Sequence, residues 1–231
     1  SGLVNAAELD GDYVLAMSHL MRNLALAEVT QDPIRISRAY HNRGVIHYDL
    51  GDLAAAEADL ERALELKETT GDLRSQAITH FYLGAVDAER NDLEAAKAHL
   101  DRALEIFRDV KDISWEGDTL AALGRLALLQ GDAKTAEENL RFAGQRCLEL
   151  GECSYAVIHL SYLAVAELDL ENMENAWEKS REAVAELDAG LLGVERPQRI
   201  YYNHYRVAQA TRHWAAARAA DPGPDIEAVG R

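Results

Sequence analysis

The sequence predicts an all-α solenoid, in which one helical unit is repeated along the chain and each copy packs on the next. Small residues recur forty positions apart at Gly44, Gly84, Gly124 and Ala164. Alanines keep the same spacing at Ala56, Ala96, Ala136, Ala176 and Ala216. The pair Gly51-Asp52 returns as Asn91-Asp92, Gly131-Asp132 and Glu171-Asn172. An unbroken period of this size indicates stacked units that share one continuous core.

The clearest copy of the unit spans residues 33–72. Asp32 is expected to cap its first helix, helix A, and Pro33 suits the first turn of that helix. Gly51 should end helix A, because glycine tolerates the left-handed conformation found at helix C-termini. Asp52 then begins the second helix, helix B, so the unit is a pair of helices joined by a tight turn.

Helix B of this copy has one apolar face, since its apolar residues recur at spacings of three and four. They are Leu53, Ala56, Leu60, Ala63 and Leu64. The alanines are expected to lie where two helices approach closely. The charged residues of helix B are predicted to form a solvated stripe, made of Glu57, Asp59, Glu61, Arg62, Glu65 and Lys67.

The other units follow from the same register. A half unit covers 1–30, with helix B from Asp12 to about Val29, and full units are expected at 33–72, 73–112, 113–152 and 153–190. A looser turn is expected at Glu171-Asn172, where the Gly-Asp pair is lost. Because helix A of the half unit lacks its start, the chain is expected to be part of a longer array.

The C-terminal part of the sequence departs from the regular spacing. The connection from Asp188 to Gln198 is rich in Gly and Pro and is expected to bend the array. A terminal partial unit at 195–220 is predicted, with helix A from about 198 to 212 and a short helix B after it. Two prolines then stop the helix, and residues 221–231 are expected to form a disordered tail.

The pattern inside each unit resembles the tetratricopeptide repeat. It has Leu-Gly late in helix A, Gly-Asp at the turn and two small residues in helix B, as in Leu123-Gly124, Gly131-Asp132 and Ala136 with Ala143. The resemblance covers roughly residues 1–220, so a single array is expected, and it implies a right-handed α-solenoid. Long units of this type resemble the arrays of bacterial multidomain regulators and scaffold proteins.

Three features depart from the family pattern. The unit is forty residues long, whereas the usual tetratricopeptide length is 34. Arg43 stands where leucine is usual. The proline expected after helix B is missing, and Gly71-Asp72, Lys111-Asp112 and Gly151-Glu152 occupy that place.

Composition argues against several classes of partner. The formal net charge is −16, and an acidic surface repels phosphate backbones, so direct binding to nucleic acid is not expected. The apolar runs are too short to span a membrane, and the first residues do not form a signal peptide. The two cysteines do not make a disulfide framework, which favours a reducing cytoplasm.

No catalytic or metal-binding motif stands out, so neither an enzyme nor a cofactor is expected. The eight histidines are scattered, and His41 and His47 should lie on different sides of one helix, since six residues correspond to about 600° of rotation. Cys147 and Cys153 have neither the C-x-x-C spacing nor a common helical face. They are therefore interpreted as structural thiols.

The resemblance implies that helix A residues line a concave groove that binds peptides or partner proteins. The groove positions with the most distinctive side chains are Arg38, His41, Tyr48, Phe81, Arg125, Tyr201 and Tyr205. Tyrosine and arginine are frequent among residues that dominate interfaces. The alternative is that several of these side chains pack against the next helix. The Lys and Asn pair with which some family members clamp a C-terminal carboxylate is absent.

Three functions remain open. The first is a cytoplasmic protein-interaction scaffold that belongs to a larger regulator and binds a protein or peptide in the groove. The second is a ligand-sensing segment of a signal-transduction ATPase or transcription regulator. The third is a structural module that self-associates through its uncapped ends.

Overall fold

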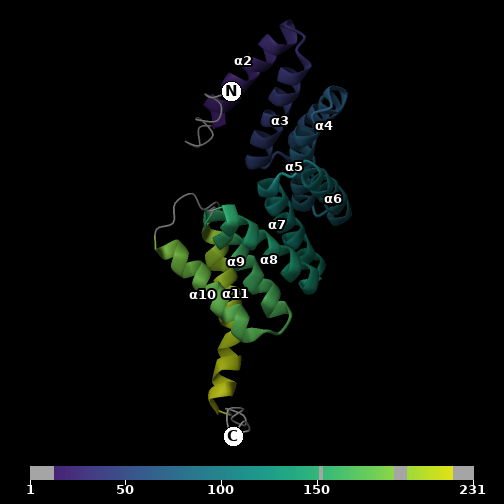
Figure 1. Ribbon diagram of the computed structural model, residues 1–231. Coiled ribbons are helices and arrows are strands. Elements are labelled where there is room, and N and C mark those ends of the chain that lie inside the picture. The colour runs from purple at the N-terminus through teal and green to yellow at the C-terminus, as the bar shows by residue number, and fades with distance from the viewer. Residues whose placement is uncertain (1–12, 151–152, 190–196, 221–231) are drawn as a thin grey trace. The chain divides into compact units, whose positions relative to one another are not determined.

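The computed structural model describes residues 13–150, 153–189 and 197–220 (Figure 1). These residues form helices joined by short turns, and no strand occurs among them. The bounds of the helices are α2 Tyr13–Val29, α3 Pro33–Asp49, α4 Leu53–Thr70, α5 Leu73–Glu89, α6 Leu93–Asp109, α7 Ile113–Gln130, α8 Ala133–Leu150, α9 Cys153–Asp169, α10 Met173–Asp188 and α11 Pro197–Ala220. The predicted all-α class is confirmed.

The chain divides into two compact bodies, residues 1–122 and 123–231, so the boundary falls inside α7. In the N-terminal body, α3 packs on α4, α4 on α5, and α5 on α6. In the C-terminal body, α9 packs on α8, α10 and α11. Within each body, these helices therefore pack on their neighbours in the chain, as stacked helical pairs must.

From α2 to α10, each helix begins twenty residues after the previous one. The cause is a two-residue signal at the turns. A residue with positive φ ends one helix, as Gly71 does at φ 70°, and an aspartate caps the next. The Asp72 carboxylate accepts a bond from the Ser75 N–H at 3.1 Å, and Asp92 accepts one from Ala95 N–H at 3.2 Å. These bonds satisfy first-turn N–H groups that have no partner within the helix.

The turn at Glu171-Asn172 is not looser than the others, contrary to the sequence-based expectation. The Asn172 N–H donates to the Glu167 carbonyl at 2.9 Å, as the Asp92 N–H does to the Asp87 carbonyl. Only the side-chain cap is lost, because the Asn172 amide donates to the Glu167 carboxylate instead. The backbone bonds close the turn whichever residue occupies it.

Helix α11 corrects a second expectation. It runs unbroken from Pro197 to Ala220 (Figure 1), so no separate helix B follows Arg212. The register would require Thr211 to adopt a positive φ, which a β-branched residue avoids. The Thr211 hydroxyl instead donates to the Val207 carbonyl within the helix. The bend predicted between Asp188 and Gln198 falls mostly on residues 190–196, which lie outside the described residues, as do the tail at 221–231 and residues 1–12.

The recurring small residues lie in the helix contacts, as predicted. Ala56, Ala96, Ala136 and Ala176 are fully buried. A Cβ atom on Gly44, Gly84 or Gly124 would lie within 2.7–2.8 Å of the leucine sixteen residues later. These glycines are therefore fixed by close helix approach. In the next pair the glycine becomes Ala164 and the leucine becomes the shorter Ser180, and both are buried.

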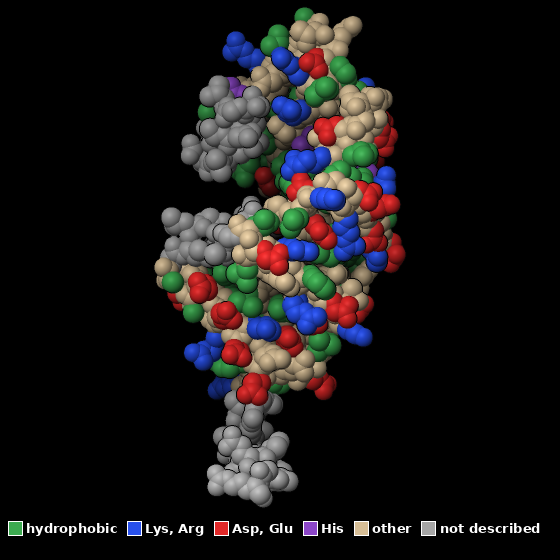
Figure 2. All heavy atoms as spheres, viewed as in Figure 1, with side chains coloured by type: hydrophobic (Ala, Val, Ile, Leu, Met, Phe, Trp, Pro, Cys, Tyr) green, Lys and Arg blue, Asp and Glu red, His purple; other side chains and the backbone are tan. Residues whose placement is uncertain are grey.

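The predicted charged stripe of α4 is only partly solvated. Asp and Glu side chains do gather along the side where α4 and α6 lie (Figure 2). However, Asp59 and Lys67 are buried. The Arg43 guanidinium pairs with the Asp59 carboxylate, with an Nε–Oδ2 distance of 2.6 Å. Lys67 donates to the Thr79 hydroxyl at 2.6 Å. Partners on the neighbouring helices α3 and α5 thus bury two charges that helical periodicity places outside.

Candidate functional site

Aromatic side chains from α3, α5 and α7 meet around Tyr82 in the N-terminal body. The Tyr82 ring lies edge-on to His41, with centroids 5.5 Å apart, and edge-on to Tyr48 at 6.4 Å. Phe81 and Trp115 complete the group, with centroids 5.5 and 6.4 Å from Tyr82. All five rings are half-buried. We call these five residues the aromatic cluster.

The aromatic cluster unites three of the predicted groove residues, His41, Tyr48 and Phe81. Tyr82 and Trp115 were not predicted. The register offers no signal for Tyr82, because the same position one unit earlier holds Asn42 and one unit later holds Ala122. Only the packing of α3, α5 and α7 side chains reveals its central place.

The aromatic cluster rests on the core of the N-terminal body. Trp115 stacks on Phe107 with centroids 5.7 Å apart and an interplanar angle of 15°, and Phe107 is fully buried. Edge-to-face and offset contacts of this kind fix ring orientation. The cluster is therefore a firmly held surface whose inner edge is core and whose outer edge meets solvent.

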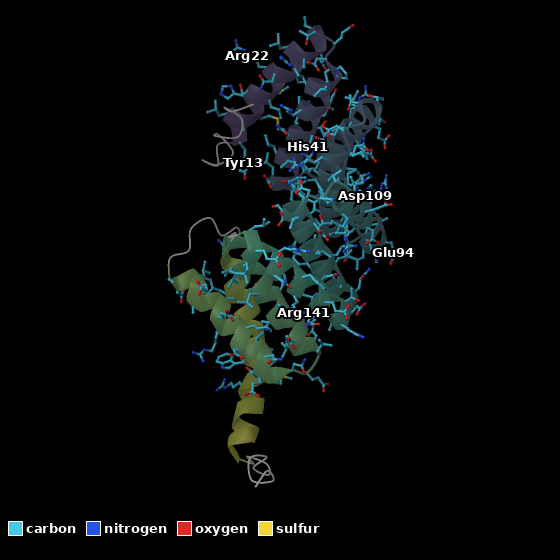
Figure 3. The ribbon with its side chains drawn as sticks, viewed as in Figure 1. Tyr13, Arg22, His41, Glu94, Asp109 and Arg141 are labelled. Atoms are coloured by element: carbon cyan, nitrogen blue, oxygen red, sulfur yellow. The ribbon has the colours of Figure 1, made fainter. Side chains whose placement is uncertain are left out.

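His41 is neutral at physiological pH. Burial, together with the smaller effect of the nearby Lys67 charge, lowers its pKa to about 3. Its Nδ1 atom lies 3.1 Å from the Thr79 hydroxyl. Figure 3 labels His41 among the side chains of α3. Together with Arg38, which is exposed, His41 lines a small pocket.

The remaining predicted groove residues belong to the C-terminal body. The Arg125 guanidinium lies over the Tyr162 ring, 5.7 Å from its centroid, a cation–π contact. Tyr201 and Tyr205 lie one helical turn apart on α11 and are 46% and 60% exposed. With Tyr202, which is 55% exposed, they form what we call the tyrosine patch.

Hydrogen bonds hold two rings of the tyrosine patch. The Tyr201 hydroxyl donates to Asp188 on α10 at 2.6 Å, and this bond to the carboxylate raises the pKa of Tyr201. The Tyr205 hydroxyl accepts from the Gln209 amide at 2.9 Å. The rings are thus oriented before any partner arrives, while much of their surface faces solvent.

Two histidines that seemed scattered in the sequence form a pair. The Nδ1 atoms of His80 on α5 and His99 on α6 are 3.0 Å apart. Burial lowers the pKa of His80 to about 4, with smaller effects from His99 and Arg102. Within the described residues, no group of three or more metal-binding side chains occurs. The Cys147 side chain is buried, and the Cys153 side chain lies outside the described part.

The family is visible in the sequence as well as in the fold. Residues 35–109 match the sequence model of the tetratricopeptide repeat. This segment therefore carries tetratricopeptide repeats. They form a scaffold family without catalytic machinery of its own. Among curated proteins, none matches the sequence significantly.

Solved structures with the same fold include several tetratricopeptide proteins. BtubC (BKLC) from P. vanneervenii is 18% identical, with a TM-score of 0.71, over 84% of this chain and 81% of that one. A Rap protein complexed with competence and sporulation factor is 17% identical, with a TM-score of 0.71, over 94% and 70%.

A third similar structure comes from a much longer protein. It is a signal transduction ATPase with numerous domains that has a tetratricopeptide repeat sensor, from Pyrococcus horikoshii. It is 15% identical, with a TM-score of 0.72, over 98% of this chain and 36% of that one. At these identities the likeness establishes the shared tetratricopeptide fold. In the part of the chain that the structure describes, no helix is long and apolar enough to cross a bilayer.

Proposed function

We propose that this chain is a protein-interaction scaffold, not an enzyme, and that its helix A side chains bind a peptide or a partner protein. The aromatic cluster is the observation that carries the proposal. Its rings are rigidly held by one another and by the buried Phe107, yet part of their surface stays exposed. A preorganised aromatic surface loses little conformational entropy on binding and supplies the large contacts typical of interface hot spots.

The tyrosine patch supplies a second surface of the same chemical kind in the C-terminal body. Two of its hydroxyl groups are engaged by Asp188 and Gln209, while its rings are exposed. Rings of this type favour an extended or helical peptide segment with apolar side chains. The scarcity of cysteine supports a cytoplasmic location as part of the proposal.

The names of two similar proteins agree with a binding role. One is a Rap protein complexed with competence and sporulation factor, and the other contains a tetratricopeptide repeat sensor. Ligand sensing is a specific form of the same proposal. It would use the same surfaces, and it predicts that the bound ligand raises the thermal stability of the chain.

The test compares partner capture by helix A variants with capture by a helix B control. Tyr48→Ala and the double variant Tyr201→Ala/Tyr205→Ala should each reduce recovery of the partner that the wild type captures, by about tenfold. Phe142→Ala is the matched control, since Phe142 is 52% exposed on α8, a helix B. Equal recovery of the partner by the wild type and by both helix A variants would contradict the proposal.

Self-association is a second candidate, supported by the apolar surface of α2. Leu15, Met21, Leu26 and Val29 are between 46% and 82% exposed on this helix. Exposed apolar side chains gathered on one element indicate a contact surface. Light scattering across a hundredfold range of concentration should show a concentration-dependent mass, which Met21→Glu/Leu26→Glu abolishes. A constant monomer mass would exclude this candidate.

A further inference from the structure

Lys67 is a buried cation that forms no ion pair with the acidic side chains that the structure describes. Its side chain is 5% exposed, and its ammonium donates to the Thr79 hydroxyl at 2.6 Å and to the Ser75 carbonyl at 3.2 Å. Among the described residues it makes no ion pair within 4 Å. An ammonium has three N–H donors, so one donor is left over. A buried charge is costly unless it is paired, which makes this lysine unusual.

Lys67 lines a pocket of about 100 Å³ between α3, α4 and the start of α5. The pocket is also lined by Ile34, Ser37, Arg38, His41, Thr70, Asp72, Ser75 and Ile78. This volume has room for a few water molecules or one small polar group. The lysine lies on α4, a helix B, and so differs in position from the groove lysine of a carboxylate clamp.

The pocket carries a net positive charge in an otherwise acidic protein. Its charged groups are two cations, Arg38 and Lys67, and one carboxylate, Asp72; His41 is neutral. The Asp72 carboxylate is engaged as the α5 cap by the Ser75 N–H. Burial lowers the pKa of Lys67 to about 8; Asp72 raises it, and the Arg38 charge lowers it. The two cations therefore repel each other, and an anion bound between them would reduce this repulsion.

We propose that this pocket binds a carboxylate group of the peptide or partner protein, held between the Lys67 ammonium and the Arg38 guanidinium. The inference rests on the proposed binding function and names the chemical group that anchors the ligand. One net positive charge matches a monovalent carboxylate better than a doubly charged phosphate. Charge-assisted bonds from a buried ammonium and an arginine are the strong kind.

Small-molecule probes test the pocket without any knowledge of the partner. The isotope-labelled full chain is titrated with each probe, and the NMR signals of its residues are followed. Ionic strength is constant and the pH is about 6.5, where Lys67 is charged. The carboxylate probes are N-acetylglycine, for a chain terminus, and the α-amide of N-acetylaspartate, for an acidic side chain. N-acetylglycinamide is the neutral control, and inorganic phosphate is the competing anion.

At least one carboxylate probe should give saturable shifts of the Lys67, His41 and Ser75 signals and raise the pKa of Lys67. The stronger probe tells whether a terminus or an acidic side chain is favoured. Arg38→Gln should weaken binding about tenfold, and because Arg38 is exposed this variant should still fold. Lys67→Met should abolish binding. Lys97→Met, which removes an exposed lysine of α6, should change nothing.

Several results would overturn the inference. They are linear shifts spread over many surface lysines, equal binding of the neutral control, tighter binding of phosphate than of either carboxylate, or unchanged affinity in Arg38→Gln. If the carboxylate probes bind while the helix A variants still capture the partner, the pocket stands and the proposed function fails. If the probes do not bind and the helix A variants lose the partner, the proposed function stands and the pocket inference fails.

Discussion

At the residue scale, a single methyl group decides whether two helices can pack at Gly84. A Cβ atom there would lie 2.8 Å from Leu100 Cγ and 3.0 Å from the Ala96 carbonyl oxygen. Gly84→Ala should therefore destabilise the chain by about 1–3 kcal/mol, measured by urea denaturation. Gly144 is the control, because nothing lies within 4 Å of its Cβ position. Gly144→Ala should stabilise α8 by about 1 kcal/mol.

The mechanism can be isolated with a double-mutant cycle. In a Leu100→Ala background the obstructing side chain is shortened, so Gly84→Ala should cost much less than in the wild type. An equal cost in both backgrounds would show that helix approach at this glycine is not limited by Leu100.

The Arg43–Asp59 pair gives a second prediction at the residue scale. Arg43→Leu removes the guanidinium from the buried Asp59 carboxylate and leaves beside it the His47 ring, whose Nε2 atom is 3.7 Å away. The free energy of unfolding should fall by about 2–4 kcal/mol, since an uncompensated buried charge is strongly unfavourable. Arg43→Leu/Asp59→Asn copies the combination Leu123 with Asn139 found two units on. Denaturation midpoints should show that the double variant regains most of the loss, and no recovery would contradict this account.

At the element scale, the turns are set by one left-handed residue followed by a cap. Lys111 takes this conformation at φ 57°, whereas Gly71 serves at the equivalent turn forty residues earlier. A side chain in this region costs about 1–2 kcal/mol. The regular helix starts arise because this signal is repeated even where glycine is absent.

Lys111→Gly should therefore stabilise the chain by about 1 kcal/mol, seen as a higher midpoint in thermal and urea unfolding. The reverse change, Gly71→Ala, should destabilise it by a similar amount. Nothing lies within 4 Å of a Cβ at Gly71, so crowding does not contribute there. If both changes have the same sign, backbone strain is not what the turns depend on.

At the scale of the whole molecule, acid should weaken the fold. Burial lowers the pKa of His41 and His159 to about 3 and that of His80 to about 4. The unfolded chain binds these protons near pH 6.5, before the folded chain does. Stability is therefore complete above about pH 6.5 and falls as the pH drops towards the folded values. Melting temperatures should be level between about pH 7.5 and pH 6.5 and should decline between about pH 6.5 and pH 5.

His159 allows this pH effect to be assigned. It is 3% exposed, and neither of its ring nitrogens has a hydrogen-bond partner among the described residues. His159→Leu should raise stability at neutral pH by about 1–3 kcal/mol. It should also flatten the pH dependence, by on the order of 1 kcal/mol per pH unit below pH 6.5. An unchanged slope would mean that His159 is protonated in the folded chain.

Much of the architecture follows from local signals in the sequence. Helix starts, turn residues and the buried alanines could be predicted because capping, left-handed glycine and helical periodicity act within a few residues. The prediction of two helices in place of α11 was wrong for a related reason. It extended the forty-residue register to Thr211, a β-branched residue that avoids the positive φ of the other turns. The candidate site was predictable only in part: the helix A residues His41, Tyr48 and Phe81 were named, but their shared neighbour Tyr82 was not.

The sequence by itself determined that this protein is an all-α array of repeated helical pairs with a net charge of −16, and that residues 35–109 carry the tetratricopeptide pattern. Only the tertiary structure decided which charges are buried and which aromatic side chains meet. Asp59 and Lys67 follow the spacing of a solvated stripe, but side chains on α3 and α5 reach them and replace water as partners. The physical reason is that burial of a side chain depends on neighbouring helices whose atoms local periodicity does not record.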